Sequence, residues 1–226
     1  MGLGRTAAAP ANLAPFTDRR RDRPVKREAV LRTAAQLFLE LGYHGTTLND
    51  VAKRLRITKP ALYNYFQSKE EILFECYRLG FEMVELAIAE TASRKGSGLD
   101  KLGAVFRAYI GVMSADFGMC LVRVDDRELS DEARAHIRKD KRKLDRRFRA
   151  IVTEGIRDGS ILPCDAKLAA FTLAGSANWI GHWYQPGGAW AASDIAEKMT
   201  LQLLNGLAVR RIRPALEPRA PRKVLP

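Results

Sequence analysis

Short hydroxyl, amide and ammonium side chains gather in the stretch from Thr46 to Lys69. These groups donate hydrogen bonds to phosphate oxygens and to the edges of bases. A helical hairpin buried in a core would not need them, so they indicate a nucleic-acid-binding surface. For Arg27, which precedes the stretch, a solvated surface charge is the alternative. The residues expected to form the surface are Arg27, Thr46, Thr47, Thr58, Lys59, Pro60, Ala61, Tyr63, Asn64, Tyr65 and Lys69.

Two short helices must position these side chains. Thr47 is placed as an N-cap with Asp50 three residues later, so that each side chain satisfies a backbone N–H of the first turn. The first helix should therefore begin at Leu48 and end at Arg54 or Leu55. Thr58 caps the second helix, whose first turn tolerates Pro60 because the missing N–H would be unpaired there. Such a helix-turn-helix inserts the start of its second helix into the major groove, and an ordinary core hairpin is the alternative.

Several positions in the same stretch form a pattern: Thr47, Val51-Ala52, Ile57-Thr58-Lys59, Leu62-Tyr63, Tyr65-Phe66 and Ser68-Lys69-Glu70-Glu71. They resemble the N-terminal signature of the TetR family of transcriptional regulators. The resemblance implies an all-α protein, with a three-helix helix-turn-helix DNA-binding domain followed by a helical effector-binding and dimerisation domain. It also implies double-stranded operator DNA as a partner. Arg56 departs from the family, which usually has a glycine in this turn, and a non-glycine residue at positive φ is strained.

Helical periodicity continues on both sides of this stretch, with no convincing strand. A helix from Val25 to Leu41 should be ended by Gly42. Its apolar face should comprise Val30, Ala34, Leu37, Phe38 and Leu41. Ser68 caps the next helix, which in the resembling family links the two domains, so that its tilt sets the distance between recognition helices. The expected divisions are a disordered extension at 1–24, the DNA-binding domain at 25–70, the ligand-binding and dimerisation domain at 71–210, and a basic tail at 211–226.

Further helices follow a break at residues 95–98. They are expected from Leu99, from Ser130 or Asp131 to Asp158, after an Asp165 N-cap, and after a Ser193 N-cap. The helix after Asp165 carries small residues that let another helix approach closely. The last two helices are expected to form half of an intersubunit four-helix bundle in a homodimer, with packing inside one subunit as the alternative.

Aromatic and methionine residues recur on these later helices. Such stripes are more often core than cavity, but they are the best candidates for a small-molecule site. Asn178-Trp179, Trp183-Tyr184 and the segment 186–188 resemble TetR-type repressors of lipid and steroid catabolism, several of which respond to acyl-CoA thioesters. The resemblance implies a small apolar effector such as an acyl-CoA. A drug-like compound and a ligand-free architectural role are the alternatives. The candidate ligand-binding residues are Phe106, Tyr109, Met113, Phe148, Phe171, Asn178, Trp179 and His182.

The net charge of +12 over 226 residues supports nucleic-acid binding only weakly, because much of it lies at the chain ends. Residues 131–149 carry nine basic and four acidic side chains, a net charge of +5. That helix face could be a second DNA surface or bind an anionic ligand such as a coenzyme A phosphate. A solvated helix face is the default interpretation.

Other classes of function lack their motifs in this sequence. There is no G-x-S-x-G, H-E-x-x-H or phosphate-binding glycine loop, so an enzyme is not expected. The three cysteines are far apart, and the carboxylates at Asp125, Asp126 and Glu128 lack a neighbouring histidine, so neither a metal nor a cofactor is expected. No apolar run approaches a membrane span and no secretory signal is evident, so a cytoplasmic protein without a membrane partner is expected.

Overall fold

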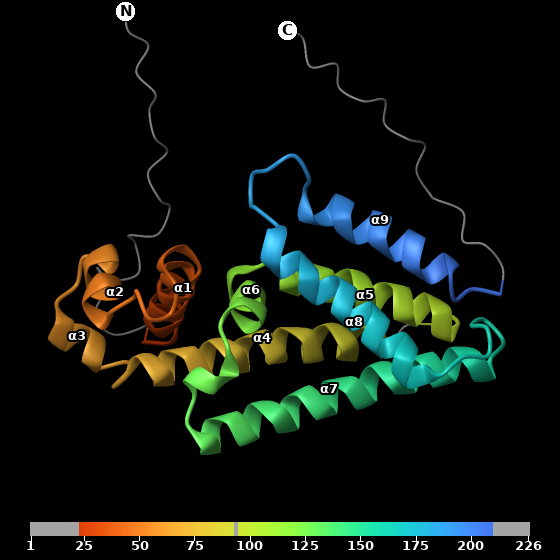
Figure 1. The fold of residues 1–226 in the computed structure, drawn as a ribbon, viewed down its shortest axis with the longest axis horizontal. Helices are drawn as coiled ribbons and strands as arrows, with labels where there is room; N and C mark the ends of the chain where they lie inside the picture. The colour runs from red at the N-terminus through yellow and green to blue at the C-terminus, as the bar shows by residue number, and fades with distance from the viewer. Residues whose placement is uncertain (1–22, 93–94, 210–226) are drawn as a thin grey trace, which may run out of the picture. The chain divides into compact units, whose positions relative to one another are not determined.

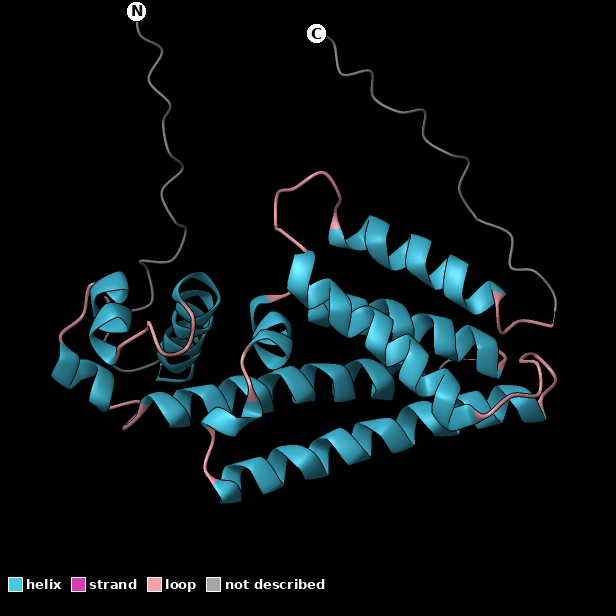
Figure 2. Cartoon of the chain, in the orientation of Figure 1, coloured by secondary structure: helices cyan, strands magenta, loops and turns pink. Residues whose placement is uncertain are grey.

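The fold consists of helices (Figures 1 and 2). The computed structural model describes residues 23–92 and 95–209, and within these ranges it has nine α-helices, one 3-10 turn and no strand beyond an isolated bridge between Ile161 and Ala208. The predicted all-α class is confirmed. Most of the predicted extension at 1–24 and all of the predicted tail at 211–226 lie outside the described residues. The elements are α1 (Arg23–Leu41), α2 (Leu48–Leu55), α3 (Lys59–Tyr63), α4 (Lys69–Ala92), α5 (Gly98–Met113), α6 (Asp116–Arg123), η2 (Asp126–Glu128), α7 (Asp131–Arg157), α8 (Ala166–Trp183) and α9 (Ala192–Asn205).

The chain forms two compact units. The first comprises residues up to Gly80 together with Asp116–Ile137, and the second comprises Phe81–Ala115 together with the residues from Arg138 onward. The first unit thus contains the segment predicted to bind DNA, together with the start of α4, α6 and the start of α7. Both α4 and α7 begin in the first unit and end in the second.

The core of the first unit forms where α1 packs against α2 and α6. Val30, Ala34, Leu37 and Phe38 are buried as predicted, but Leu41 is 53% exposed. The prediction for Leu41 is wrong because it is the last residue of α1, and the chain turns away at Gly42, whose φ is +78°. From α4, the buried Tyr77 hydroxyl donates to the carbonyl of Val124 at 2.6 Å, which ties α4 to the segment after α6.

In the second unit, α5 packs against both α8 and α9. The buried residues of α5 follow helical spacing, and α7 contributes Phe148 and Val152. The Asp165 N-cap of α8 is confirmed, since its carboxylate accepts hydrogen bonds from the N–H groups of Lys167 and Leu168. The buried positions that join the three helices are Leu102, Phe106, Ile110, Leu173, Ala177, Ile180, Ile195 and Leu204.

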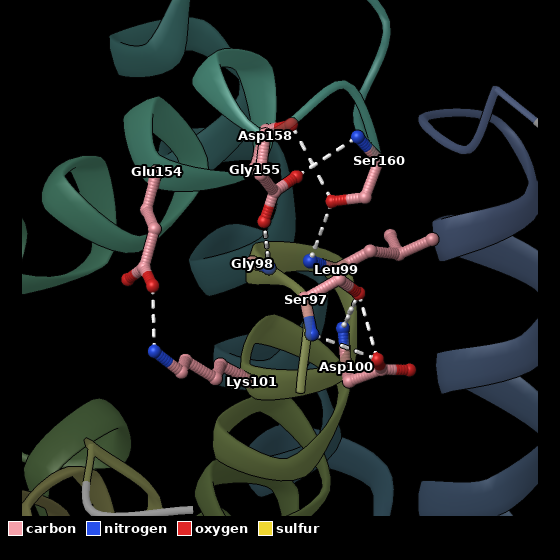
Figure 3. A network of polar contacts seen from close by, with 9 residues as sticks. All are labelled: Ser97, Gly98, Leu99, Asp100, Lys101, Glu154, Gly155, Asp158 and Ser160. Atoms are coloured by element: carbon pink, nitrogen blue, oxygen red, sulfur yellow. Dashed lines mark hydrogen bonds and ion pairs between the residues drawn. The ribbon is translucent and has the colours of Figure 1, made fainter. Parts of the chain in front are cut away.

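The start of α5 rests on the end of α7 (Figure 3). Asp158 accepts a hydrogen bond from the N–H of Gly98 at 2.6 Å, and the Ser160 hydroxyl accepts one from Leu99 at 3.1 Å. A Cβ atom at Gly98 would lie 2.2 Å from the backbone nitrogen of Gly155, so the two helices approach more closely than any side chain allows. The predicted start at Leu99 is one residue late, because Ser97 and Asp100 form a capping box that begins the helix at Gly98.

The predicted Ser193 cap of α9 is also wrong. Ala191 is the N-cap residue, makes no side-chain hydrogen bond, and starts the helix at Ala192. Burial of Ile195 and Ala196 holds this first turn in place without a side-chain cap. None of the described helices is by itself long and apolar enough to cross a membrane, and α5 and α6 reach that threshold only as a bent pair.

Candidate functional site

The helix-turn-helix begins with the predicted capping box. The Thr47 hydroxyl accepts a hydrogen bond from the N–H of Asp50 at 3.2 Å, and the Asp50 carboxylate accepts from the N–H of Thr47 at 3.0 Å and from its hydroxyl at 2.6 Å. These hydrogen bonds from Thr47 lower the pKa of Asp50. Helix α2 runs from Leu48 to Leu55, as predicted, and buries Val51, Ala52 and Leu55.

The turn between α2 and α3 is left-handed at Arg56, with φ +56° and ψ +39°. Among the described residues, no other non-glycine residue has a positive φ. The N–H of Arg56 donates to Lys53 and that of Ile57 donates to Ala52, so two carbonyls at the end of α2 are satisfied. This is the geometry for which the family resemblance implies a glycine, and the Arg56 side chain is left exposed beside α3.

Helix α3 presents most of its side chains outward. Thr58 caps it by accepting from the N–H of Ala61 at 3.3 Å, and Leu62 anchors it with a fully buried side chain. The Lys59 ammonium lies 5.8 Å from the centre of the Tyr63 ring. A hydroxyl, an ammonium and a phenol therefore share the accessible side of one short helix. Of the predicted residues here, Thr47, Thr58, Lys59, Pro60 and Asn64 are exposed, and Ala61, Tyr63 and Tyr65 are partly exposed.

Thr46 does not belong to this surface. Its side chain is buried, and its hydroxyl lies 3.1 Å from the carbonyl oxygen of Leu37 and 2.9 Å from that of Gly42. The expectation that Thr46 is exposed is wrong. Its role is to hold the loop before α2 onto the end of α1.

Two predicted cations make internal contacts in the first unit. The Arg27 guanidinium pairs with Glu75 at 2.9 Å and lies 4.6 Å from the centre of the Phe66 ring. The Lys69 ammonium donates to the carbonyls of Tyr43 at 2.8 Å and Thr46 at 3.1 Å. Both charges are already held by internal hydrogen bonds, whereas the Lys59 ammonium contacts only the face of the Tyr63 ring among the described residues. The exposed Arg56 is not among the residues predicted from the sequence, although its place in the turn was the available signal.

Five of the eight candidate ligand-binding residues lie in or beside the interior of the second unit. The Tyr109 hydroxyl donates to Asn178 at 2.6 Å, which joins α5 to α8, and its ring meets that of Phe148 edge-on at 5.4 Å. Burial raises the pKa of Tyr109 well above its usual value, so the phenol is neutral. Phe106 and Met113 are also buried. The structure thus places one polar pair among aromatic and methionine side chains.

The other three residues are on the outside of α8. Phe171 is 51% exposed, Trp179 is 65% exposed, and His182 is exposed beside the Trp179 ring. The expectation that Phe171 and Trp179 line an interior cavity together with the buried candidates is therefore wrong for the single chain. The cause is helical spacing, because Leu173, Ala177 and Ile180 turn the opposite face of α8 inward. Leu168 and Trp183 extend the exposed apolar face.

A capped helix-turn-helix with an accessible second helix, followed by a helical second unit, defines a helical DNA-binding regulator. Two family models match the chain: that of "Bacterial regulatory proteins, tetR family" at residues 30–76, and that of "Tetracyclin repressor-like, C-terminal domain" at residues 95–207. The chain belongs to the TetR family, whose members are transcriptional regulators and not enzymes.

Among curated relatives, the chain is 26% identical to the HTH-type transcriptional repressor KstR2 of Mycolicibacterium smegmatis, an alignment that covers 80% of this chain and 90% of that protein. KstR2 of Rhodococcus jostii is 27% identical, in an alignment that covers 81% of this chain and 91% of that protein. The predicted resemblance to repressors of lipid and steroid catabolism is confirmed.

Solved structures agree in fold. AibR in complex with isovaleryl coenzyme A and operator DNA superposes with a TM-score of 0.70 and 27% identity, covering 79% of this chain and 98% of AibR. The ketosteroid regulator KstR2 of Mycobacterium tuberculosis superposes with a TM-score of 0.75 and 22% identity, covering 82% of this chain and 96% of that chain.

Proposed function

We propose that this protein is a cytoplasmic repressor that binds a palindromic operator as a homodimer and releases it when a small apolar effector binds. The observation that carries the proposal is the accessible face of α3, where Thr58, Lys59 and Tyr63 stand around a buried Leu62 anchor. In a helix-turn-helix, such residues reach base edges in the major groove, while the first helix crosses the backbone.

The effector region proposed is the interior around Tyr109, Phe106, Met113 and Phe148. Aromatic and methionine side chains suit an acyl chain, and the Tyr109–Asn178 hydrogen bond offers a polar group that a thioester carbonyl could engage. AibR, a structural neighbour with 27% identity, was solved with isovaleryl coenzyme A and operator DNA. This supports the acyl-CoA class.

Helix α4 would carry the signal because it begins in the first unit and ends in the second. In the second unit its Glu85 pairs with Lys143 at 3.2 Å and Arg147 at 3.4 Å, so the position of α4 is coupled to that of α7. To change the DNA-bound population from 99:1 to 1:99, the effector must prefer the released conformation by ~10⁴-fold, or ~5.5 kcal/mol. A buried acyl chain contributes ~0.8 kcal/mol per CH₂, so chain length should matter.

The homodimer would form through the exposed face of α8, together with α9. This apolar face is the kind of surface that a partner subunit covers in a helical bundle. It includes Leu168, Phe171, Trp179 and Trp183.

The test is a titration of the operator-bound protein with acyl-CoAs of increasing chain length, followed by fluorescence anisotropy of a labelled operator. We expect longer thioesters to release DNA and free coenzyme A to leave it bound. Release only by drug-like apolar compounds would instead indicate a regulator of efflux. Indifference to every ligand, with no rise in melting temperature, would indicate an architectural DNA-binding protein.

A further inference from the structure

The outer face of α7 carries a stripe of basic side chains that the helix-turn-helix does not use. Arg138, Lys139, Arg142 and Arg146 are all exposed. At 3.6 residues per turn they lie within a sector of about 100°, and at 1.5 Å per residue the stripe is about 12 Å long. All four belong to the second unit. We call them the α7 basic stripe.

The charges of the stripe are unbalanced. Within residues 23–92 and 95–209, none of the four side chains has a hydrogen-bond or ion-pair partner, whereas Lys143 and Arg147 on the same helix both pair with Glu85. Asp145 is the one acid three or four positions from any member of the stripe, and both its carboxylate oxygens are engaged by Arg149. Like charges one turn apart destabilise a helix, so an anionic partner would relieve this repulsion.

We propose that the α7 basic stripe binds the phosphate backbone of duplex DNA without regard to base sequence. Duplex DNA carries one negative charge about every 1.7 Å along its axis, so a stripe of about 12 Å lies within reach of more than one phosphate. Three of the four side chains are arginines, whose planar guanidinium suits phosphate oxygens.

An anionic membrane is less well matched to this surface. Helices that lie in a lipid interface insert an apolar face beside their basic residues. The apolar residues of α7, including Ile137, Phe148 and Val152, are instead buried inside the protein. The exposed side of α7 therefore offers mainly charge and no large apolar side chain, which suits a phosphate backbone.

The test measures binding to a labelled random duplex that lacks any palindrome, as a function of salt. Affinity falls as salt rises, so the slope of log affinity against log salt is negative. The double variant Arg142→Gln with Arg146→Gln should make this slope shallower by about 1.8, because each lost phosphate contact contributes about 0.9. Between 50 and 200 mM salt, the loss of affinity should then be about 12-fold smaller than for the wild type.

Three controls make the result decisive. Lys95→Gln with Lys198→Gln removes two exposed charges elsewhere in the second unit and should leave the slope unchanged. Arg142→Lys with Arg146→Lys keeps the charge and should retain the wild-type slope, which separates charge from folding. Lys139→Gln should make the slope shallower by about 0.9 if the double variant is too unstable to measure.

A wild-type slope in both Lys139→Gln and the Arg142/Arg146 glutamine variant would overturn the proposal. The proposal would also be overturned if these variants lost binding to vesicles of equal parts phosphatidylglycerol and phosphatidylcholine but bound random DNA with the wild-type salt slope. The stripe would then be a lipid-binding surface. The proposal is independent of operator reading by α3. Lys59→Ala should lower the preference for operator over random DNA while the dependence of the random-DNA slope on Arg142 and Arg146 persists.

Discussion

At the scale of single residues, the most direct consequence of the helix-turn-helix is the accessibility of Lys59 and Tyr63. Both stand on the accessible side of α3, and Lys59 has no partner among the described residues except the face of the Tyr63 ring. Each is therefore available to a base edge or a phosphate. A side chain with internal partners, such as Lys69, would have to give up existing hydrogen bonds first.

Replacing Lys59 or Tyr63 with Ala should weaken operator binding by about 5- to 150-fold, the equivalent of ~1–3 kcal/mol for a lost base contact. The melting temperature should stay within a degree or two, because neither side chain supports the core. Gel-shift titration measures the affinity. Lys53→Ala, on the exposed side of α2, is the matched control and should change affinity less; equal affinity in all the variants would reject α3 as the recognition helix.

Thr46 carries the opposite expectation. Thr46→Val removes the buried hydroxyl that donates to the carbonyls of Leu37 and Gly42. Loss of this donor should destabilise the fold by about 1 kcal/mol. Urea unfolding measures this loss. Operator affinity should be unchanged at temperatures where the variant is folded, and a large loss of affinity without loss of stability would restore Thr46 to the DNA surface.

The sequence distinguished these roles only in part. The capping pattern located Thr47 and Thr58 correctly, because a cap depends on neighbours three residues away. The burial of Thr46 depends on Leu37 and Gly42 in the preceding helix and its end, which no local pattern encodes. The same holds for Arg27, whose partner Glu75 lies 48 residues later.

At the scale of elements, close packing of α5 on α7 depends on Gly98. Gly98→Ala would place a Cβ atom 2.2 Å from the backbone nitrogen of Gly155, where no flexible side chain can give way. It should therefore destabilise the protein by several kcal/mol, of the order of a severe overpacking mutation.

Gly111→Ala in the same helix is the matched control. No atom lies within 4 Å of its Cβ position, so alanine should stabilise the helix by about 0.5–1 kcal/mol. Thermal unfolding should therefore shift down for Gly98→Ala and up for Gly111→Ala. A shift of the same sign in both variants would contradict the packing described for α5 and α7.

Most helices could be located from the sequence, because apolar periodicity and terminal glycines such as Gly42 and Gly159 bound them. Two helix starts were predicted wrongly, for different reasons. Residues 95–98 were read as a break, although Ser97 and Asp100 carry the capping-box pattern. The start of α9 has no side-chain cap to predict.

At the scale of the whole molecule, the exposed face of α8 is the feature that a single chain leaves unexplained. The residues predicted to line a cavity there were selected by their type, and the sequence could not show that Phe171 and Trp179 point outward while Tyr109 and Phe148 point inward. If a second copy covers this face, the exposed aromatics have a structural role.

Leu168→Arg should convert a dimer to a monomer, because a charge would be buried in the subunit interface. Leu86→Arg is the matched control, since Leu168 is 64% exposed and Leu86, on α4, is 63% exposed. Sedimentation at micromolar concentration distinguishes the two. A wild-type protein that sediments as a monomer, or a Leu86→Arg variant that alone dissociates, would rule out the α8 face as the interface.

The central claim is that a symmetric pair of α3 helices reads a specific DNA sequence, and selection of bound fragments from a random or genomic DNA pool tests it most directly. The wild-type protein should enrich a two-fold symmetric motif whose half-sites lie about one helical turn, ~34–36 Å, or a multiple of it apart. The double variant Lys59→Ala with Tyr63→Ala should lose this enrichment while remaining folded. Failure of the wild type to enrich any motif, or enrichment of the same motif by the double variant, would contradict the claim.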